Sequence, residues 1–118
     1  MWRLELSSQW ERDQKWYEKK RPNELAAVLR NLRRYLIQLN ATQNHKSFTT
    51  GYMHPEPHGI VAIDQRGGGC GNLQETRLYV YPEEVHKVLY IITIGNKDEQ
   101  QSDIQFCNQF VESLKPIS

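Results

Sequence analysis

Residues 75–97, ETRLYVYPEEVHKVLYIITIGNK, have the pattern of two β-strands joined by a short turn. The turn is predicted at residues 82–84, Pro-Glu-Glu. A hairpin brings its first and last residues to the same edge of the sheet, so Arg77 and Lys97 are expected to share that edge, far from the turn. Two cations on a rigid scaffold suit the binding of a phosphate and the stabilisation of charge that develops on it.

The composition is that of one domain with a packed core. The chain has 118 residues, of which 38% are apolar and 25% charged, and it contains 3 Trp, 6 Tyr and 3 Phe. A single domain spanning residues 1–118 is therefore expected. No apolar run reaches the roughly 18 residues of a membrane span, and Met1 to Arg12 does not resemble a signal peptide. We expect a cytoplasmic protein without membrane contact.

The net charge and the spacing of the cysteines and histidines argue against several classes of site. The net charge of +1 argues against strong nonspecific binding of nucleic acid by the whole surface. Cys70 and Cys107 lack metal-type spacing, and both are expected to be reduced. The run HPEPH at residues 54–58 offers two histidines but no third or fourth ligand. Neither a metal nor another cofactor is expected.

The first half of the chain predicts one strand and two helices. Residues 2–6 alternate between apolar and polar side chains, as in a half-buried strand. Ser8 and Glu11 have capping-box spacing, which predicts the start of a helix. A long amphipathic helix is predicted after Pro22. Its apolar face is formed by Leu25, Val28, Leu29, Leu32, Tyr35, Leu36 and Leu39.

The second half predicts an extended loop, strands and a closing helix. Residues 40–58 are polar and contain Pro55 and Pro57, so a loop is expected there. Residues 59–64 predict a short strand, and residues 66–72, with four of the seven glycines, a flexible connector. A last helix is predicted after the hairpin, with Asp98 as a candidate N-cap. Its apolar positions are Ile104, Cys107, Phe110, Val111 and Leu114.

This order predicts an α+β domain with a mostly antiparallel four-stranded sheet, two N-terminal helices and one C-terminal helix. The helices are expected to cover one sheet face. In the first hairpin strand, Leu78 and Val80 alternate with Arg77, Tyr79 and Tyr81. One face is therefore expected to be core, and the other, with cations and tyrosines, to be the working surface.

The element order and the hairpin motifs resemble the RelE/ParE/HigB superfamily of bacterial toxin-antitoxin toxins. The motifs are an arginine inside the Thr-Arg-Leu-Tyr-Val-Tyr strand and an apolar strand that ends in Gly-x-Lys. The resemblance covers roughly residues 2–114. It implies a RelE/ParE-like fold, an antitoxin as partner and, in the ribonuclease branch, cleavage of messenger RNA at the ribosome. By motif position, Arg77 and Lys97 would be the cations that assist cleavage.

Metal-independent cleavage of RNA requires three roles. Arg77 would stabilise the charge on the phosphorane, Lys97 would neutralise the phosphate, and a base must accept the proton of the ribose 2′-OH. His54 and His58 are both chemically suited to act as that base near neutral pH. Further contacts to RNA are expected from Arg66, Tyr79, Tyr81 and Lys46, with the tyrosines stacking on a base.

Each of these assignments has an alternative. Arg77 is also suited to a structural ion pair with Glu75 or Asp64, and Lys97 to a strand-end charge that discourages edge pairing. Tyrosines on a half-buried strand often serve packing alone. Two other functions fit the resemblance: inhibition of gyrase by a ParE-like toxin, and protein binding without catalysis.

Overall fold

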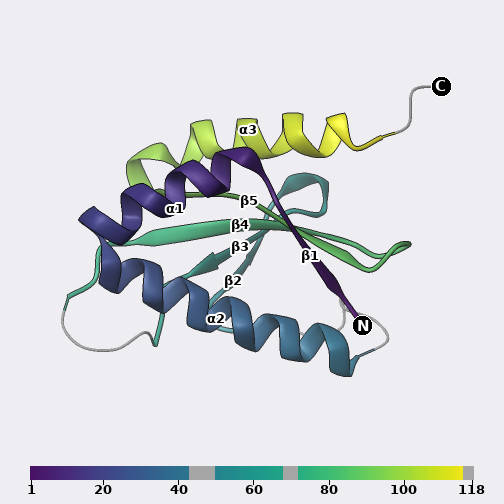
Figure 1. The fold of residues 1–118 in the computed structure, drawn as a ribbon, viewed down its shortest axis with the longest axis horizontal. Helices are drawn as coiled ribbons and strands as arrows, with labels where there is room; N and C mark the ends of the chain where they lie inside the picture. The colour runs from purple at the N-terminus through teal and green to yellow at the C-terminus, as the bar shows by residue number, and fades with distance from the viewer. Residues whose placement is uncertain (43–49, 68–71, 116–118) are drawn as a thin grey trace.

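The computed structural model describes residues 1–42, 50–67 and 72–115. The strands are β1 (Arg3–Leu6), β2 (Met53–Pro55), β3 (Val61–Asp64), β4 (Thr76–Glu83) and β5 (Val88–Asn96). The α-helices are α1 (Ser8–Lys20), α2 (Pro22–Ala41) and α3 (Gln100–Ser113), and the short 3-10 helices are η2 (Pro57–Gly59) and η3 (Lys97–Glu99). The strands form one sheet in the order β1-β5-β4-β3-β2 (Figure 1).

The sheet is mixed and five-stranded, so the prediction of four mostly antiparallel strands is correct only in part. Strands β2 to β5 pair antiparallel, whereas β1 lies parallel to β5, with Arg3 opposite Val88 and Leu6 opposite Ile91. The chain passes through α1, α2 and three strands before it returns beside β1. A parallel neighbour needs such a long connection, and no local pattern indicates which strand it will be.

The strand that was not predicted is β2, and it lies in the segment that was expected to be a loop. Proline disfavours the helical conformation in the residue before it, so Pro55 and Pro57 keep His54 and Glu56 extended. A proline is tolerated in an edge strand, where it need not donate to a ladder. The two prolines therefore allow a strand of 3 residues at the edge of the sheet.

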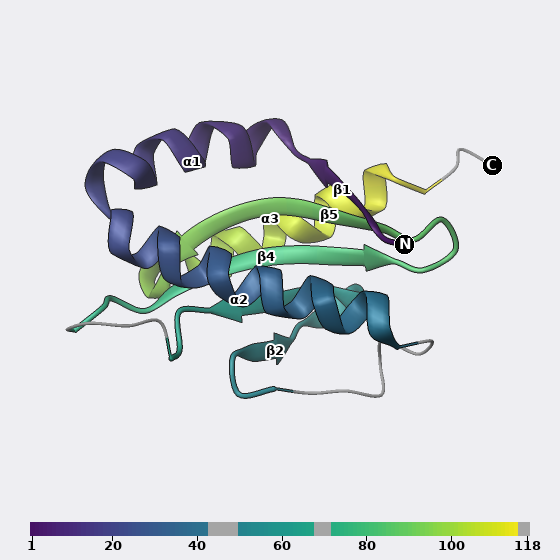
Figure 2. The same cartoon turned by 60° about the horizontal axis from the view of Figure 1, so that its bottom comes forward.

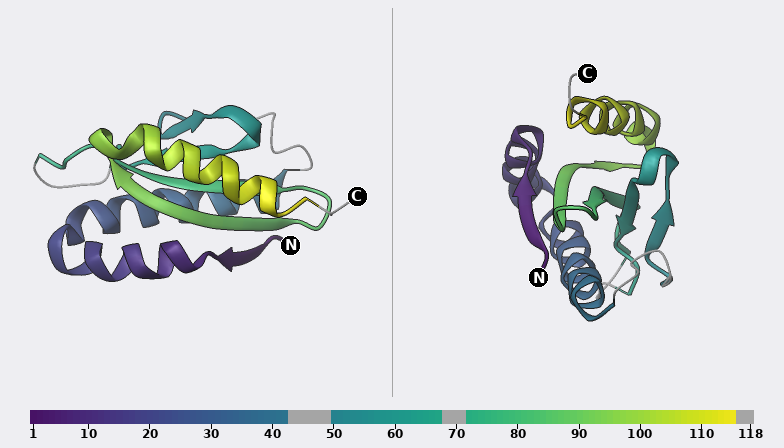
Figure 3. Two further views of the ribbon diagram at one scale, coloured as in Figure 1. Left: turned by 90° about the horizontal axis from the view of Figure 1, so that it is seen from above. Right: turned by 90° about the vertical axis from the view of Figure 1, so that its right-hand side faces the viewer.

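Helices lie on both faces of the sheet, which corrects the prediction that they cover one. Helices α1 and α2 pack on one face and α3 lies across the other (Figures 2 and 3). The core under α1 and α2 includes Trp10, Tyr35, Ile63, Leu78 and Ile91. The core under α3 is smaller and consists of Ile60, Ala62, Tyr79, Ile92, Cys107 and Val111.

Ser7 caps α1, one residue before the predicted cap. Its hydroxyl accepts a hydrogen bond from the Trp10 N–H at 3.0 Å and donates one to the carbonyl of Ile92. The same side chain therefore starts the helix and ties it to β5. Trp10 and Tyr17 are both buried, as the predicted apolar stripe requires.

The hairpin of β4 and β5 confirms the predicted alternation along its first strand, but part of the face that was expected to be the working surface is a second core. Leu78 and Val80 belong to the core under α1 and α2, whereas Tyr79 belongs to the core under α3. The turn comes at residues 84–87, later than predicted. A bulge between Tyr79 and Val80 shifts the register, so side chains do not alternate strictly between the two faces along β5.

The last helix begins at Gln100, and Asp98 is not its cap. Asn96 and Glu99 form a capping box around η3, which leads directly into α3. Cys107 of α3 is a buried free thiol, and burial raises its pKa to about 12. Cys70 lies outside the described residues. Within the described ranges, no helix is long and apolar enough to cross a membrane.

Candidate functional site

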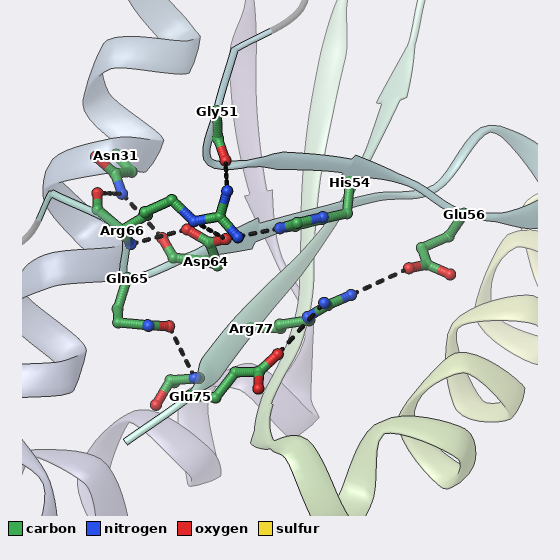
Figure 4. Close-up of polar contacts among 10 residues, drawn as sticks. Asn31, Gly51, His54, Glu56, Asp64, Gln65, Arg66, Glu75 and Arg77 are labelled. Carbon is green, nitrogen blue, oxygen red and sulfur yellow. Dashed lines mark hydrogen bonds and ion pairs between the residues drawn. The ribbon is translucent and has the colours of Figure 1, made fainter. Parts of the chain in front are cut away.

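Arg77 lies between two carboxylates on the sheet face that bears α3. The side chain comes from the second residue of β4, with Asp64 of β3 on one side and Gly95 of β5 on the other. One terminal nitrogen is 3.5 Å from Glu56 Oε1, and the other is 3.4 Å from Glu75 Oε1 (Figure 4). Both distances exceed the roughly 2.7–3.2 Å that is usual for an N–H···O hydrogen bond, so the two contacts are long ion pairs. Of the alternative partners expected from the sequence, Glu75 is one and Asp64 is not.

Asp64 pairs instead with His54 and Arg66. His54 Nε2 is 2.6 Å from Asp64 Oδ2, and the backbone N–H of Arg66 donates to Oδ1 at 2.8 Å. The Nε of Arg66 lies 3.5 Å from Oδ2. The Asp64 side chain is only 5% exposed, and that of His54 is 25% exposed. A buried carboxylate therefore holds a partly exposed imidazole.

The strand register explains why these groups lie on one face. Asp64 is directly opposite Arg77, and His54 is opposite Ala62 on the other side of β3. Side chains directly opposite each other in neighbouring strands lie on the same face. The unpredicted strand β2 therefore brings His54 to the face that carries Asp64 and Arg77 (Figure 4).

Helix α2 anchors the chain at residues 64 and 66, and again at residue 74, from the opposite face of the sheet. The buried amide of Asn31 donates to the carbonyls of Asp64 at 2.9 Å and Arg66 at 3.0 Å. At the other end, Glu24 accepts a hydrogen bond from the Gln74 N–H at 3.0 Å. These bonds from α2 hold the backbone at the end of β3, and they thereby fix the position from which the Asp64 carboxylate extends.

Lys97 and Arg66 are both exposed cations that directly follow, or nearly follow, a strand of the sheet. Lys97 follows β5 directly, and β5 pairs with β4 so that Asn96 is opposite Thr76. The hairpin thus brings the backbones of Arg77 and Lys97 to the same end of the sheet. Arg66 donates from its guanidinium to the carbonyl of Gly51 at 2.9 Å.

The two histidines of the HPEPH run lie in different environments. His58 has a left-handed backbone with φ of 66° and is exposed on η2. It lines a shallow pocket with Asn108, Glu112 and Lys115 of the α3 end. Of these two histidines, only His54 contacts a carboxylate among the described residues.

The tyrosines of β4 differ in access. Tyr79 is fully buried under α3, and burial raises its pKa. A ring in that position is inaccessible for stacking on a base, so packing describes Tyr79 better than RNA contact. Tyr81 is half-buried and stacks on Tyr90 with 6.3 Å between ring centroids. The predicted RNA contact at Lys46 lies outside the described residues.

Asp103, in the first turn of α3, packs against β5 beside this face. A Cβ atom at Gly95 would overlap the Asp103 carboxyl group. Burial raises the pKa of Asp103 to about 7, and the charges of Glu99 and Asp13 add to the shift. Oδ2 of Asp103 has no hydrogen-bond partner among the described residues. The folded protein therefore holds this group better as the acid than as the carboxylate.

Asp103→Asn is expected to stabilise the fold above neutral pH. The folded pKa of about 7 exceeds the ordinary 3.8, so wild-type stability falls as pH rises through that window. After a discount for partial exposure, the gain at about pH 8 should be about 1–3 kcal/mol, with little change at about pH 4. Urea unfolding at both pH values measures it, and the exposed Asp98→Asn is the control. An equal gain at both pH values would contradict the assigned cause.

Neither Glu56 nor the pairing of Asp64 with His54 was predicted from the sequence. A signal for the second was present, because Asp64 ends an apolar strand in which a buried carboxylate requires a partner. The carboxylate at Glu56 gave no such signal. Its contact with Arg77 depends on strand β2 and on the turn through η2, which the sequence did not predict.

Comparison with known proteins supports the fold. No protein-family model matches the chain, and no curated protein matches it. Among solved structures, the chain is similar to a mutant of the E. coli toxin RelE in its free state. The two share 15% sequence identity with a TM-score of 0.50, over 97% of this chain and 98% of that chain. At this identity the similarity concerns the fold alone, and it confirms the RelE-like fold implied by the sequence resemblance.

Proposed function

We propose that this chain is a toxin of a toxin-antitoxin system that cleaves messenger RNA without a metal ion. The RelE-like fold supports the toxin class. The observation that carries the chemistry is the placement of His54 and Arg77 on one sheet face, on the two strands that flank β3. A proton acceptor and a cation that can bind phosphate, presented on the same face, are the minimum that this reaction needs.

In the proposed reaction, the ribose 2′-oxygen forms a bond to the adjacent phosphorus while the bond from phosphorus to the 5′-oxygen breaks. His54 takes the proton of the 2′-OH, and the departing 5′-oxygen takes a proton from solvent. The products are a 2′,3′-cyclic phosphate and a 5′-hydroxyl end. Holding the 2′-oxygen, phosphorus and leaving oxygen in line would supply a further part of the rate.

Arg77 would bind the phosphate by exchanging its carboxylate partners for phosphate oxygens. Its contacts with Glu56 and Glu75 are 3.5 and 3.4 Å long, whereas a phosphate accepts shorter, bidentate hydrogen bonds from a guanidinium. Lys97 and Arg66, both exposed, would contact neighbouring phosphates. Tyr81 is the accessible tyrosine of β4 for stacking on a base.

Two partners belong to this proposal. An antitoxin would inhibit the protein by covering the face that carries Arg77, through a helix or strand laid beside the sheet. The ribosome would present the messenger RNA, which fits a net charge of only +1, because such a surface attracts free RNA weakly.

End mapping of cellular transcripts tests the proposal. Induced expression of the chain in E. coli is expected to arrest growth and to generate 5′-hydroxyl ends within messages. Purified protein added to ribosomes that carry a defined message should leave 2′,3′-cyclic phosphates at the same sites. DNA breaks with an SOS response but without message cleavage would indicate gyrase inhibition instead. Expression that harms none of several hosts would indicate a binding domain without catalysis.

A further inference from the structure

The carboxylate of Asp64 is a buried group with a fixed orientation. Its side chain is 5% exposed, and the Arg66 backbone N–H donates to Oδ1 at 2.8 Å. Behind it, Asn31 donates to the Asp64 backbone carbonyl at 2.9 Å. A buried carboxylate is costly unless its oxygens accept hydrogen bonds, so the groups on Oδ2 are part of what keeps it there. The nearer group is the ring of His54, with Nε2 at 2.6 Å, and the other is Nε of Arg66 at 3.5 Å.

The contact between His54 and Asp64 selects one tautomer of the imidazole. Nε2 and Oδ2 are 2.6 Å apart, which is a hydrogen-bonded distance. A carboxylate only accepts hydrogen bonds, so the proton is carried by Nε2. In a neutral imidazole the other nitrogen, Nδ1, then has a free lone pair and no proton. The geometry thus prepares Nδ1 as a proton acceptor.

His58 lacks these conditions. It is exposed on η2, and the residues around it in its pocket come from the end of α3 rather than from β3 or β4. The nearby carboxylate in that pocket belongs to Glu112, whose side chain is 72% exposed and pairs with Lys115. Nothing in this setting fixes the tautomer of His58.

We infer that Asp64 is a positioning residue, which holds His54 as the Nε2–H tautomer so that Nδ1 accepts the substrate proton. The identity of that proton, which is on the 2′-OH of RNA, rests on the proposed function. Beyond that function, the inference states which of the two histidines acts, which of its nitrogens accepts the proton, and what Asp64 does. The orientation of the ring itself follows from contacts that need no substrate.

Nitrogen NMR of the histidine rings tests the orientation without any substrate. In uniformly ¹⁵N-labelled full-length protein above neutral pH, His54 is expected to give the Nε2–H pattern, with its signals assigned by their loss in His54→Gln. Asp64→Asn should shift that pattern toward a mixture or toward the Nδ1–H form, because an amide can also donate to Nε2. A wild-type His54 in the Nδ1–H form, or a pattern unchanged by Asp64→Asn, would overturn the inference.

Glu83→Gln is the matched control. Glu83 holds the exposed His86 through a contact of 3.0 Å to Nδ1, at the far end of the hairpin. This variant should alter the ring signals of His86, leave those of His54 unchanged and leave RNA cleavage at the wild-type level. The comparison shows whether a change at His54 follows from the loss of its own partner, Asp64, or from the loss of any carboxylate that contacts a histidine.

Cleavage kinetics separate the inference from the proposed function. Asp64→Asn is expected to lower kcat by at least about tenfold, because it removes part of the roughly 10²–10⁴-fold that a positioned base supplies. KM should remain nearly unchanged. Full kcat in Asp64→Asn would overturn the inference while the proposed function stands. If wild-type protein cleaves no RNA, the proposed function fails and so does the substrate role of Nδ1. The NMR result then still decides whether Asp64 fixes the ring.

Discussion

Replacing Arg77 with alanine is expected to slow RNA cleavage by about 10²–10³-fold, the usual cost of removing a donor that stabilises charge in the transition state. The strand register places Arg77 between Asp64 and Gly95, and no other described cation lies in that row of the sheet. The measurement is the single-turnover rate on a defined message bound to ribosomes. Growth arrest on induced expression should disappear in parallel.

Two further variants interpret that result. Arg77→Lys keeps the charge but loses the planar fork, so an intermediate rate is expected if bidentate phosphate contact matters. Arg12→Ala removes an exposed arginine of α1 that bonds only to Gln9 among the described residues, and it should cleave at the wild-type rate. Wild-type cleavage by folded Arg77→Ala would leave Arg77 as a structural partner of Glu56 and Glu75.

Stability must be measured beside activity for Arg77→Ala. The Glu56 side chain is 13% exposed, and loss of its cation leaves a largely buried carboxylate with one partner fewer. A cost of about 1–3 kcal/mol in the free energy of unfolding is expected on that ground. A variant that unfolds at the assay temperature would lose activity for this reason, so urea unfolding in the assay buffer is the required companion measurement.

The parts of the fold that the sequence predicted are those encoded locally. The apolar stripe of α2 and the alternation of Leu78 and Val80 with Tyr79 need only short windows of sequence, and both are present. The pairing of β1 with β5 joins segments more than 80 residues apart, about which no short window carries information. Strand β2 was missed because Pro55 at its end and Pro57 just beyond it are typical of loops as well as of edge strands.

The candidate site was predictable to the same extent. The placement of Arg77 and Lys97 at one end of the sheet follows from the hairpin alone, and the register agrees with it. The burial of Tyr79 follows from α3 on the second face, which no periodicity within β4 reveals. The pairing of His54 with Asp64 needed both strand β2 and its register, so chemistry singled out His54 while its partner went unrecognised.

Replacing His54 with glutamine should be the most damaging single change to catalysis, with an expected loss of about 10²–10⁴-fold in kcat. Glutamine retains a side chain of similar size that can still donate to the Asp64 carboxylate, so the fold and KM should change little. Single-turnover rates over a range of message concentrations measure both effects.

His58→Gln and His86→Gln decide whether the loss belongs to His54 alone. His86 is exposed near the hairpin turn, so His86→Gln should keep the wild-type rate. Among the described residues, no carboxylate fixes the ring of His58, so His58→Gln is expected to retain most activity. If instead His58→Gln loses the activity while His54→Gln keeps the wild-type rate, the base is His58 on η2. The pair of His54 and Asp64 would then serve only to tie β2 to β3.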